Sequence, residues 1–349
     1  MSPIIREYER KKLDYIILHT GQHYSFKMDK IFFNQLKLPQ PKYNLDIGSG
    51  TQAEQTGRIM IAVEKILARE PPNIVLVQGD TNTTLAASLA AAKLQVKTAH
   101  VEAGLRSFDM SMPEEINRII ADHVSEYLLA PTNVSKKNLL EEGLSKDAIS
   151  VTGNTIVDAI YQALHMASIK NIFPKGLALK PNEYFLVTLH RQENVDKMDR
   201  LKYVMKSLRL IYQGFSLPLI FPIHPRTKKK IKQFGLQLPK GVIVTDPLDF
   251  FQFLQLEANA RMVLTDSGGV QEETCILRTP CVTLRNNTER PETLKVGSNI
   301  VAGIEPMKVK EAVETMYHKE KKWKNPFGEG DASKKIVKIL QEREGLRRS

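Results

Sequence analysis

The chain has 349 residues, of which 42% are hydrophobic and 26% are charged, an ordinary composition for a globular protein. The formal net charge of +11 favours an anionic partner, either a nucleic acid or a small dianionic substrate, but does not specify a fold. The two cysteines, Cys275 and Cys281, lack the CxxC spacing of a metal or redox pair. We interpret them as packing residues in a reduced compartment.

No apolar run is long enough to span a bilayer, and the N-terminal segment MSPIIREYERKK lacks the apolar stretch of a signal peptide. We therefore expect a cytoplasmic protein with no membrane partner. The basic residues are scattered, and no known RNA- or DNA-binding motif is present. A nucleic-acid partner is therefore not expected either.

Short β-branched runs alternate with longer helical stretches along the whole chain. In order, the runs predict strands at 14–20, 73–79, 96–102, 125–131, 149–153, 183–189, 217–223, 241–247, 261–266 and 281–285. Helices are predicted at 2–12, 82–94, 133–142, 197–212, 249–259 and 331–347. This alternation indicates an α/β fold with parallel sheets and right-handed crossovers.

The alternation pauses at 161–181, a stretch that contains Pro174, Gly176 and Pro181. We interpret it as the end of a helix followed by a linker. The sequence then predicts two doubly wound, Rossmann-like domains at 1–165 and 166–330. A C-terminal helix with a charged tail follows at 331–349 and can pack back on the first domain.

Ligands of open α/β sheets bind beyond the carboxyl ends of the strands, so the residues that follow each strand are the candidate site. In the first domain they include Gln22, His23, Asp80, Glu102 and Arg106. In the second they include His190, His224, Ser267, Gly268, Gly269 and Arg290. Two domains that face each other across a cleft would bring the two sets together.

The segment TDSGGVQEE at 265–273 carries the sharpest local signal. A strand ends, Ser-Gly-Gly makes the turn and a helix begins, which predicts a phosphate site at the helix N-terminus. Glu272 or Glu273, one turn into the helix, would reach ribose hydroxyls. An ordinary capped helix after a tight turn is the alternative interpretation.

Two other ligand classes are disfavoured. Residues 48–53 match the dinucleotide pattern G-x-G-x-x-A, but the Pro-interrupted segment before them is no buried strand. No His/Cys cluster has metal-ligand spacing. We therefore expect neither a nicotinamide nor a metal, and no other cofactor.

Several ionisable residues are candidates for catalysis. Asp80 and Glu102 end apolar strands, where side chains point into the crevice, and Glu114 follows Pro113 at a predicted helix start. Glu114 also suits the helix dipole, so a structural role stays open. His190 and His224 occupy equivalent places after strands of the second domain, and packing roles stay open for both.

Nine motifs in order give the chain a family resemblance. They are GQHY (21–24), QGDTNT (78–83), HVEAGLRS (100–107), PEEINR (113–118), GNTIVDA (153–159), LHRQEN (189–194), HPRT (224–227), TDSGGVQEE (265–273) and TERPE (288–292). Together they resemble the non-hydrolysing UDP-N-acetylglucosamine 2-epimerases over about residues 1–345. That family has the two-domain architecture of glycogen phosphorylase and many glycosyltransferases.

The resemblance implies an isomerase that inverts carbon 2 of UDP-N-acetylglucosamine to give UDP-N-acetylmannosamine. UDP leaves and returns through 2-acetamidoglucal, no cofactor is needed, and the product enters polysaccharide or glycan biosynthesis. By position, Asp80, Glu102, Glu114 and His190 match the family's catalytic residues. The family's substrate-binding residues are matched by Ser267, Gly268, Gly269, Glu273, Arg106, His224 and Arg290.

The resemblance also implies a homodimer. In bacterial members a second UDP-N-acetylglucosamine binds as an activator, and Gln22, His23 and Arg58 lie where that site would be. Family members begin with an apolar strand and a Gly-Thr-Arg-Pro-Glu loop, whereas this sequence starts at the following helix with Ser2-Pro3. We therefore expect the functional protein to be longer at its N-terminus.

Three other functions stay open at this point. The same scaffold supports a hydrolysing epimerase or a glycosyltransferase, either of which would release free UDP. A binding module without activity is the second, and a nucleic-acid-binding protein is the third. The substituents on the sugar are also open, since related epimerases act on diacetamido uronic acid derivatives.

Overall fold

The computed structural model describes residues 1–22, 33, 36–170 and 179–345. The chain divides into two compact units, one formed by Met1–Ala159 with Gly328–Ser349 and the other by Ile160–Phe327. The boundary at 159/160 precedes the expected 165/166 by six residues. The predicted linker falls largely on 171–178, outside the described residues.

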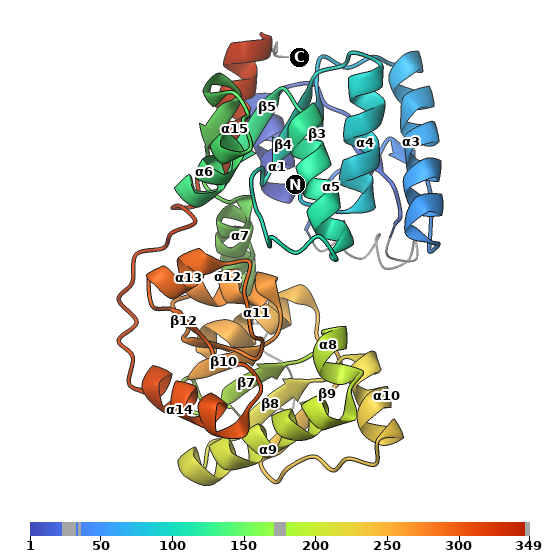
Figure 1. Ribbon diagram of the computed structural model, residues 1–349. Coiled ribbons are helices and arrows are strands. Elements are labelled where there is room, and N and C mark those ends of the chain that lie inside the picture. Colours follow the sequence, from blue (N-terminus) through green and yellow to red (C-terminus); the bar gives the residue numbers. More distant parts are fainter. Residues whose placement is uncertain (23–32, 34–35, 171–178, 346–349) are drawn as a thin grey trace. The chain divides into compact units, whose positions relative to one another are not determined.

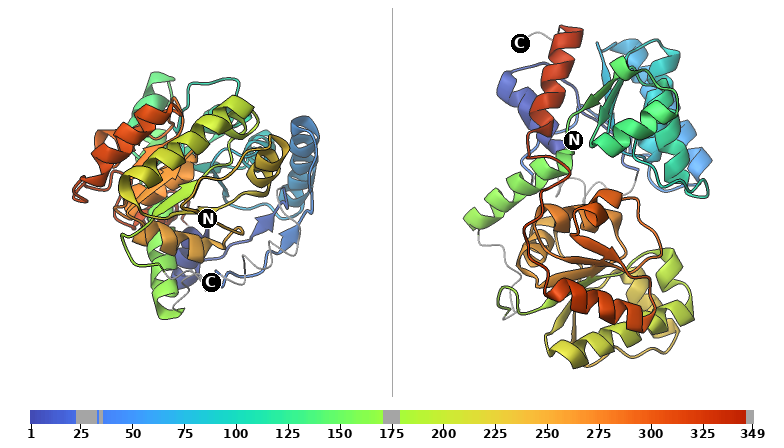
Figure 2. Two further views of the ribbon diagram at one scale, coloured as in Figure 1. Left: turned by 90° about the horizontal axis from the view of Figure 1, so that it is seen from below. Right: turned by 60° about the vertical axis from the view of Figure 1, so that its left-hand side comes forward.

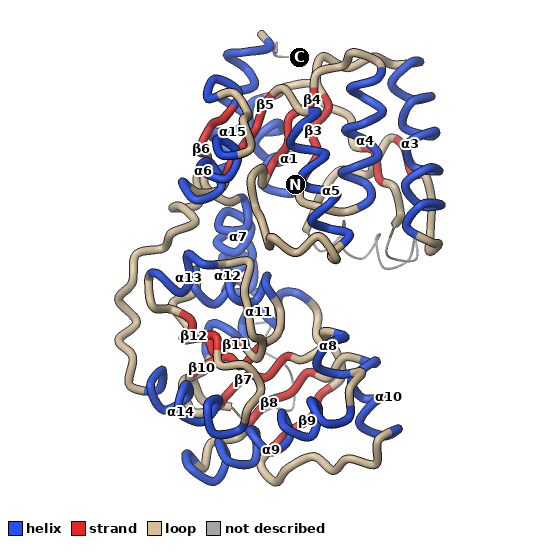
Figure 3. Tube along the Cα trace, viewed as in Figure 1, coloured by secondary structure: helices blue, strands red, loops and turns tan. Residues whose placement is uncertain are grey.

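The first unit contains two parallel sheets (Figures 1 and 3). The larger has the order β3 (Val75–Gln78), β4 (Thr98–Val101), β5 (Tyr127–Ala130) and β6 (Ile149–Val151). The smaller pairs β1 (Leu18–His19) with β2 (Tyr43–Asn44). Within the described ranges, β1 and β3 are not hydrogen-bonded to each other.

Helices cover both faces of the four-stranded sheet. On one face, α4 (Asn82–Lys93) packs between α3 (Gln52–Arg69) and α5 (Pro113–Val124). On the other, α1 (Ser2–Lys11) packs beside α15 (Ala332–Glu344), seen as the blue and red helices of Figure 2. Other helices among the described residues of this unit are α6 (Asn133–Glu141), the short 3-10 turn Lys146–Ala148 and the start of α7 (Thr155–Lys170).

The alternating strand pattern explains these layers. In β3, Val77 joins the cluster that α3 and α4 contribute, whereas Leu76 faces the cluster formed with α1 and α15. Ile336, Val337 and Leu340 of α15 are fully buried in the latter cluster. The last helix of the chain is therefore part of the hydrophobic core of the first unit.

The second unit is one six-stranded parallel sheet with the order β12-β11-β10-β7-β8-β9. Its strands are β7 (Phe185–Thr188), β8 (Leu219–Pro222), β9 (Val242–Thr245), β10 (Met262–Thr265), β11 (Cys281–Thr283) and β12 (Asn299–Val301). Its helices are α8 (Gln192–Val195), α9 (Met198–Phe215), α10 (Pro225–Gln233), α11 (Phe250–Asn259), α12 (Gly268–Ile276), α13 (Pro291–Lys295) and α14 (Pro306–Tyr317). In β7, Phe185 and Val187 face the α9/α14 layer, while Leu186 and the preceding Tyr184 face α11, and all four are fully buried.

The order of this sheet sets the position of its ligand edge. The chain proceeds outward from β7 to β9 and then returns to place β10 on the other side of β7. The strand order therefore reverses between β7 and β10, and such a switch point opens a crevice at the carboxyl ends of the two strands. His190 follows β7 and Ser267 follows β10, so both lie at this edge.

In the described part of the chain, no helix is long and apolar enough to cross a membrane.

Candidate functional site

Asp80 and Glu102 follow β3 and β4, which are neighbouring parallel strands in register at Gln78 and Val101. The Gln78 amide Nε2 donates to Glu102 Oε1 at 2.6 Å. Gly79 has φ +75°, and a Cβ at this position would lie 3.6 Å from Glu102 Oε2. The segment that carries Asp80 therefore runs directly beside the Glu102 carboxylate.

The backbone of Glu102 is unusual because its φ is +72°. A non-glycine residue in the left-handed region costs about 1–3 kcal/mol and persists only where its surroundings impose it. Its N–H donates to the Leu129 carbonyl at 3.2 Å, which holds the peptide against β5. Such residues gather at functional sites, which supports a role for this carboxylate.

Helix α5 fixes the orientation of Asp80. The Arg118 guanidinium binds the Asp80 carboxylate, and its other arm lies 2.6 Å from Glu115 Oε2. Asn117 Nδ2 donates to the Asp80 carbonyl at 2.9 Å. Glu114 is exposed in the first turn of the same helix, so one helix carries this carboxylate and positions Asp80.

Glu115 was not predicted from the sequence. It is buried, and its carboxylate accepts from the backbone N–H groups of Ser107 at 3.0 Å and Phe108 at 2.9 Å. The adjacent Glu114 and Glu115 thus face different surroundings, one solvent and the other the 107–108 loop. Because successive residues of a helix point about 100° apart, the sequence indicates that Glu114 and Glu115 have different surroundings. It does not indicate that Glu115 binds the 107–108 loop.

Arg106 was predicted to contact substrate, but its guanidinium turns inward. The residue is 5% exposed and lies 2.8 Å from Asp122 and 2.6 Å from Glu142. Its Nη1 also donates a hydrogen bond to the backbone carbonyl of Leu105. These contacts give Arg106 a structural role, and we do not retain it among the proposed substrate contacts.

The three residues of the expected activator site have different surroundings. Gln22 is buried, and its amide oxygen accepts from the Thr83 N–H at 3.0 Å and hydroxyl at 2.8 Å. Arg58 is exposed on α3 and donates to the Ser49 carbonyl at 3.4 Å. His23 lies outside the described residues. The activator site stays a prediction.

In the second unit, Ser267 is the N-cap of α12, and its hydroxyl accepts from the Val270 N–H at 3.5 Å. The first N–H groups of a helix have no partner within it and, with the helix dipole, form an anion site. Gly268 does not have positive φ, but a Cβ there would lie 2.2 Å from Glu289 Oε1. Close approach of the neighbouring loop therefore explains this glycine.

Asp266, buried immediately before this turn, holds the segment that carries His190. Its carboxylate accepts from the N–H groups of His190 at 3.1 Å and Arg191 at 3.0 Å, and His190 Nδ1 lies 3.3 Å from Oδ1. Although burial opposes it, His190 and the backbone donors keep the pKa of Asp266 below its ordinary value. Asp266 thereby fixes His190 beside the Ser267 turn.

His224 lies close to His190, with ring centroids 6.1 Å apart. Its Nδ1 accepts from the Arg226 N–H at 3.2 Å, so it also caps α10. Partial burial and the neighbouring His190 and Arg226 lower the pKa of His224. Among the described residues, no group of three His, Cys, Asp or Glu side chains is arranged to hold a metal ion.

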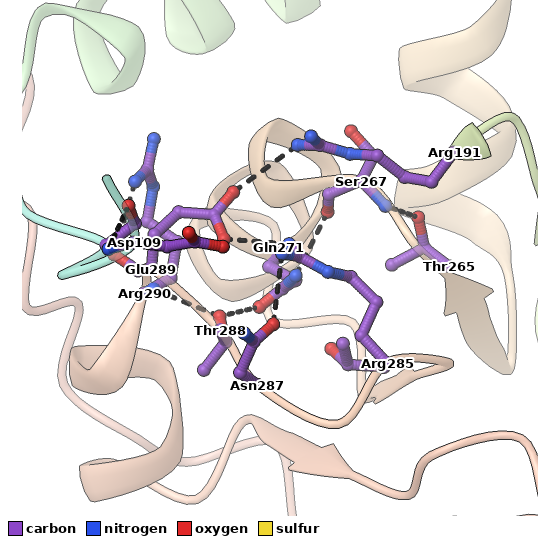
Figure 4. A network of polar contacts seen from close by, with 12 residues as sticks. Asp109, Arg191, Thr265, Ser267, Gln271, Arg285, Asn287, Thr288, Glu289 and Arg290 are labelled. Atoms are coloured by element: carbon purple, nitrogen blue, oxygen red, sulfur yellow. Dashed lines mark hydrogen bonds and ion pairs between the residues drawn. The ribbon is translucent and has the colours of Figure 1, made fainter. Parts of the chain in front are cut away.

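A cationic cluster adjoins the Ser267 turn (Figure 4). Glu289 lies between Arg285, at 2.7 Å, and Arg191, at 3.5 Å. Although burial would raise it, Arg285 and Arg290 keep the pKa of Glu289 below its ordinary value. Arg290 lies 2.9 Å from Glu272 as well, so the predicted Arg290 is held against α12.

Glu273, the predicted ribose-binding residue, is an electrostatic neighbour of Glu257 of α11. Glu257 is fully buried, and burial together with Glu273 raises its pKa well above the ordinary value, while burial also raises the pKa of Glu273. Two buried carboxylates that interact in this way are costly when both are ionised, so one of them carries a proton. We assign this proton to Glu257 because it is the more buried of the pair.

A hollow of about 800 Å³ lies beside the segments that follow β11 and β12 in the second unit. It is lined by Arg200, Tyr203, Lys206, Asn286 and part of the 301–308 segment. None of the predicted site residues lines it.

Comparison with known proteins identifies the family. The family model described as UDP-N-acetylglucosamine 2-epimerase matches residues 6–341. A UDP-N-acetylglucosamine 2-epimerase of Methanocaldococcus jannaschii is 53% identical over 348 residues, covering 97% of this chain and 94% of that protein.

The chain belongs to the UDP-N-acetylglucosamine 2-epimerase family. The resemblance predicted from the nine motifs is thereby confirmed. The family also contains a Pseudomonas aeruginosa UDP-2,3-diacetamido-2,3-dideoxy-D-glucuronate 2-epimerase, 41% identical over 95% of this chain and 92% of that protein.

Solved epimerase structures have the same fold. The M. jannaschii UDP-GlcNAc 2-epimerase in complex with UDP-GlcNAc and UDP matches with a TM-score of 0.88 and 53% identity, covering 98% of this chain and 95% of that one. The Neisseria meningitidis UDP-GlcNAc 2-epimerase bound to UDP-GlcNAc matches with a TM-score of 0.89 and 31% identity, covering 98% and 96%. The predicted α/β fold of two Rossmann-like domains is confirmed.

The protonated Glu257 generates a prediction about stability. Because its pKa is higher in the folded chain than the ordinary 4.5, the folded state binds this proton more tightly. The resulting stabilisation is present below about pH 4.5 and is lost as the pH rises through the folded pKa. Glu257→Gln mimics the protonated acid, so it should raise the free energy of unfolding at about pH 8 and change it little at about pH 4.5.

Denaturant unfolding at the two pH values measures this difference. Glu311→Gln, an exposed glutamate of the same unit, is the matched control and should follow the unaltered chain at both. Parallel pH curves for Glu257→Gln and the unaltered chain would contradict the assignment of the proton.

Proposed function

We propose that this chain interconverts UDP-N-acetylglucosamine and UDP-N-acetylmannosamine by reversible epimerisation at carbon 2 of the sugar. The observation that carries the proposal is the placement of Asp80 and Glu102 at the ends of adjacent strands, within motifs of the epimerase family. The M. jannaschii relative named for this substrate, at 53% identity, supports the choice of sugar.

The chemistry explains why several carboxylates are needed. The hydrogen on carbon 2 is not acidified by a neighbouring carbonyl, so its direct removal at neutral pH is very slow. In the proposed route the bond from carbon 1 to the UDP oxygen breaks, and UDP leaves with the electron pair. A carboxylate then removes the carbon 2 proton, and the C–H electrons form the double bond of 2-acetamidoglucal.

The return step reverses these changes with one difference. A second carboxyl group delivers a proton to carbon 2 from the opposite face, and the UDP oxygen re-forms its bond to carbon 1. Protons and electron pairs balance without an oxidant or reductant, so no nicotinamide takes part. Acid and base groups on both faces are required, and we propose Asp80, Glu102 and Glu114 for these roles.

Residues of the second unit bind the nucleotide in this proposal. The departing diphosphate gains negative charge, which the N-terminus of α12 at Ser267, Gly268 and Gly269 stabilises. The imidazole rings of His190 and His224, 6.1 Å apart, lie beside this turn, and Arg290 supplies a positive charge. Glu273 accepts hydrogen bonds from the ribose hydroxyls.

The P. aeruginosa relative suggests a second sugar to test, since it is named for a diacetamido uronic acid nucleotide. Its 41% identity, against 53% for the M. jannaschii enzyme, favours the N-acetylglucosamine derivative. A homodimer, activation by a second substrate molecule, a cytoplasmic location and a role in polysaccharide or glycan biosynthesis belong to the same proposal.

Substitution of the carboxylates tests their chemical roles. Asp80→Asn, Glu102→Gln and Glu114→Gln should each lower turnover by about 10²–10⁴-fold, the usual loss for an acid or base, while preserving shape and folding. Turnover is measured by following the two UDP-sugar epimers and free UDP in the same reaction. A variant that reforms the product slowly should release 2-acetamidoglucal and UDP. The exposed Glu141→Gln is the control and should keep full turnover.

Near-normal turnover in all three variants would remove these carboxylates from the mechanism. Free N-acetylmannosamine with UDP as the sole products of the unaltered chain would indicate the hydrolysing reaction instead.

The phosphate-binding turn has its own test. A Cβ at Gly269 would meet only Ser267 Oγ, at 3.9 Å, so Gly269→Val adds bulk at the turn with little internal clash. We expect UDP affinity, measured by calorimetric titration, to fall at least about tenfold, or 1.4 kcal/mol. Gly57→Ala on α3, where a Cβ meets nothing within 4 Å, is the control. Unchanged affinity in a folded Gly269→Val chain would place the nucleotide elsewhere.

A further inference from the structure

His100 is a buried histidine to which the proposed reaction assigns no role. It lies in β4, and its side chain is fully buried. Nδ1 lies 2.6 Å from Asp122 Oδ1, and Nε2 lies 2.8 Å from the carbonyl oxygen of Gly79. Both ring nitrogens therefore face oxygen atoms at hydrogen-bonding distance.

Neither of these oxygens has a proton to give. A backbone carbonyl only accepts hydrogen bonds. The Asp122 carboxylate already accepts from the Gly104 N–H at 3.1 Å and lies 2.8 Å from the buried Arg106 guanidinium, and both contacts stabilise its ionised form. A neutral imidazole would turn one lone pair toward an acceptor, so both nitrogens must carry hydrogen.

The surrounding charges fit a cation at this position. His100 and Arg106 supply two positive charges, and Asp122 and Glu142 supply two negative ones, so the buried cluster is neutral as a whole. Glu102, two residues further along the chain and just after β4, adds a third carboxylate near the ring. Although burial opposes it, Asp122, the Gly79 carbonyl and Glu102 raise the pKa of His100 above its ordinary value.

The contacts of His100 reach every segment that bears a proposed acid or base. The Gly79 carbonyl immediately precedes Asp80, and Glu102 follows the strand that contains His100. Asp122 lies on α5, whose first turn carries Glu114 and whose Arg118 binds Asp80. One ring thus links the ends of β3 and β4 to α5.

We propose that His100 is a permanently protonated positioning residue, whose imidazolium joins Asp122 to the Gly79 carbonyl and fixes the segments carrying Asp80, Glu102 and Glu114. This inference rests on the proposed function for the role of those carboxylates. The protonation state itself does not depend on the reaction, so the two can fail separately.

The direct test is nitrogen NMR of the full chain with ¹⁵N-labelled histidine rings. At about pH 8, above the ordinary histidine pKa of about 6.5, we expect one of the eight histidines to show two protonated ring nitrogens. His100→Gln should remove that signal, and His318→Gln, an exposed histidine of the second unit, should retain it. A ring nitrogen of His100 with the shift of an unprotonated atom would overturn the proposal.

Asp122→Asn tests the positioning role, because it removes the counter-charge while preserving shape. We expect His100 to lose its second proton at about pH 8 and kcat to fall by about 10²-fold, the usual cost of a small misplacement of reacting groups. KM should change little, and UDP affinity should be retained, because the proposed UDP residues belong to the other unit. Unchanged kcat with a neutral His100 would overturn the positioning role. An imidazolium in an unaltered chain with no epimerase activity would instead contradict only the proposed function.

Discussion

The described strands pair only in parallel, and this constraint determines where chemistry can occur in both units. Parallel strands bring all their carboxyl ends to one edge, where loops and helix N-termini converge. In the first unit that edge carries Asp80 and Glu102, and in the second it carries His190 and the Ser267 turn. The four-stranded and six-stranded sheets pack apolar side chains on both faces, and the residues proposed for chemistry follow the strand ends.

Buried carboxylates hold these edges in place. Asp266 fixes the backbone of His190, Glu115 fixes the 107–108 loop, and Asp122 anchors His100 and Arg106. A buried carboxylate is costly unless cations or N–H groups surround it, so each of them enforces the geometry of its donors. The edges are therefore shaped before any ligand binds, as expected of a site that stabilises charge in a transition state.

Each of the ten strands predicted from periodicity contains an observed strand, and each of the six predicted helix ranges overlaps an observed helix. The sequence analysis did not single out β2, β12, α3 or α14. Asp80, Glu102, His190 and Ser267 could be placed at the sheet edges from the sequence, because each directly follows a predicted strand. Asp266, Asp122, Glu115 and Glu257 escaped prediction because their partners lie elsewhere in the sequence, for instance 76 residues from Asp266 to His190. The family motif that contains Arg106 likewise does not reveal its ion pairs with Asp122 and Glu142.

The central claim is that this chain removes and replaces the carbon 2 proton of a UDP-linked N-acetylhexosamine. Proton NMR of UDP-N-acetylglucosamine incubated with the full chain in deuterated water tests it most directly. The account predicts that the manno epimer appears with deuterium at carbon 2, that deuterium also enters the gluco epimer, and that free UDP does not accumulate. A substrate that keeps its carbon 2 proton, or that is converted to UDP and free sugar, would contradict it.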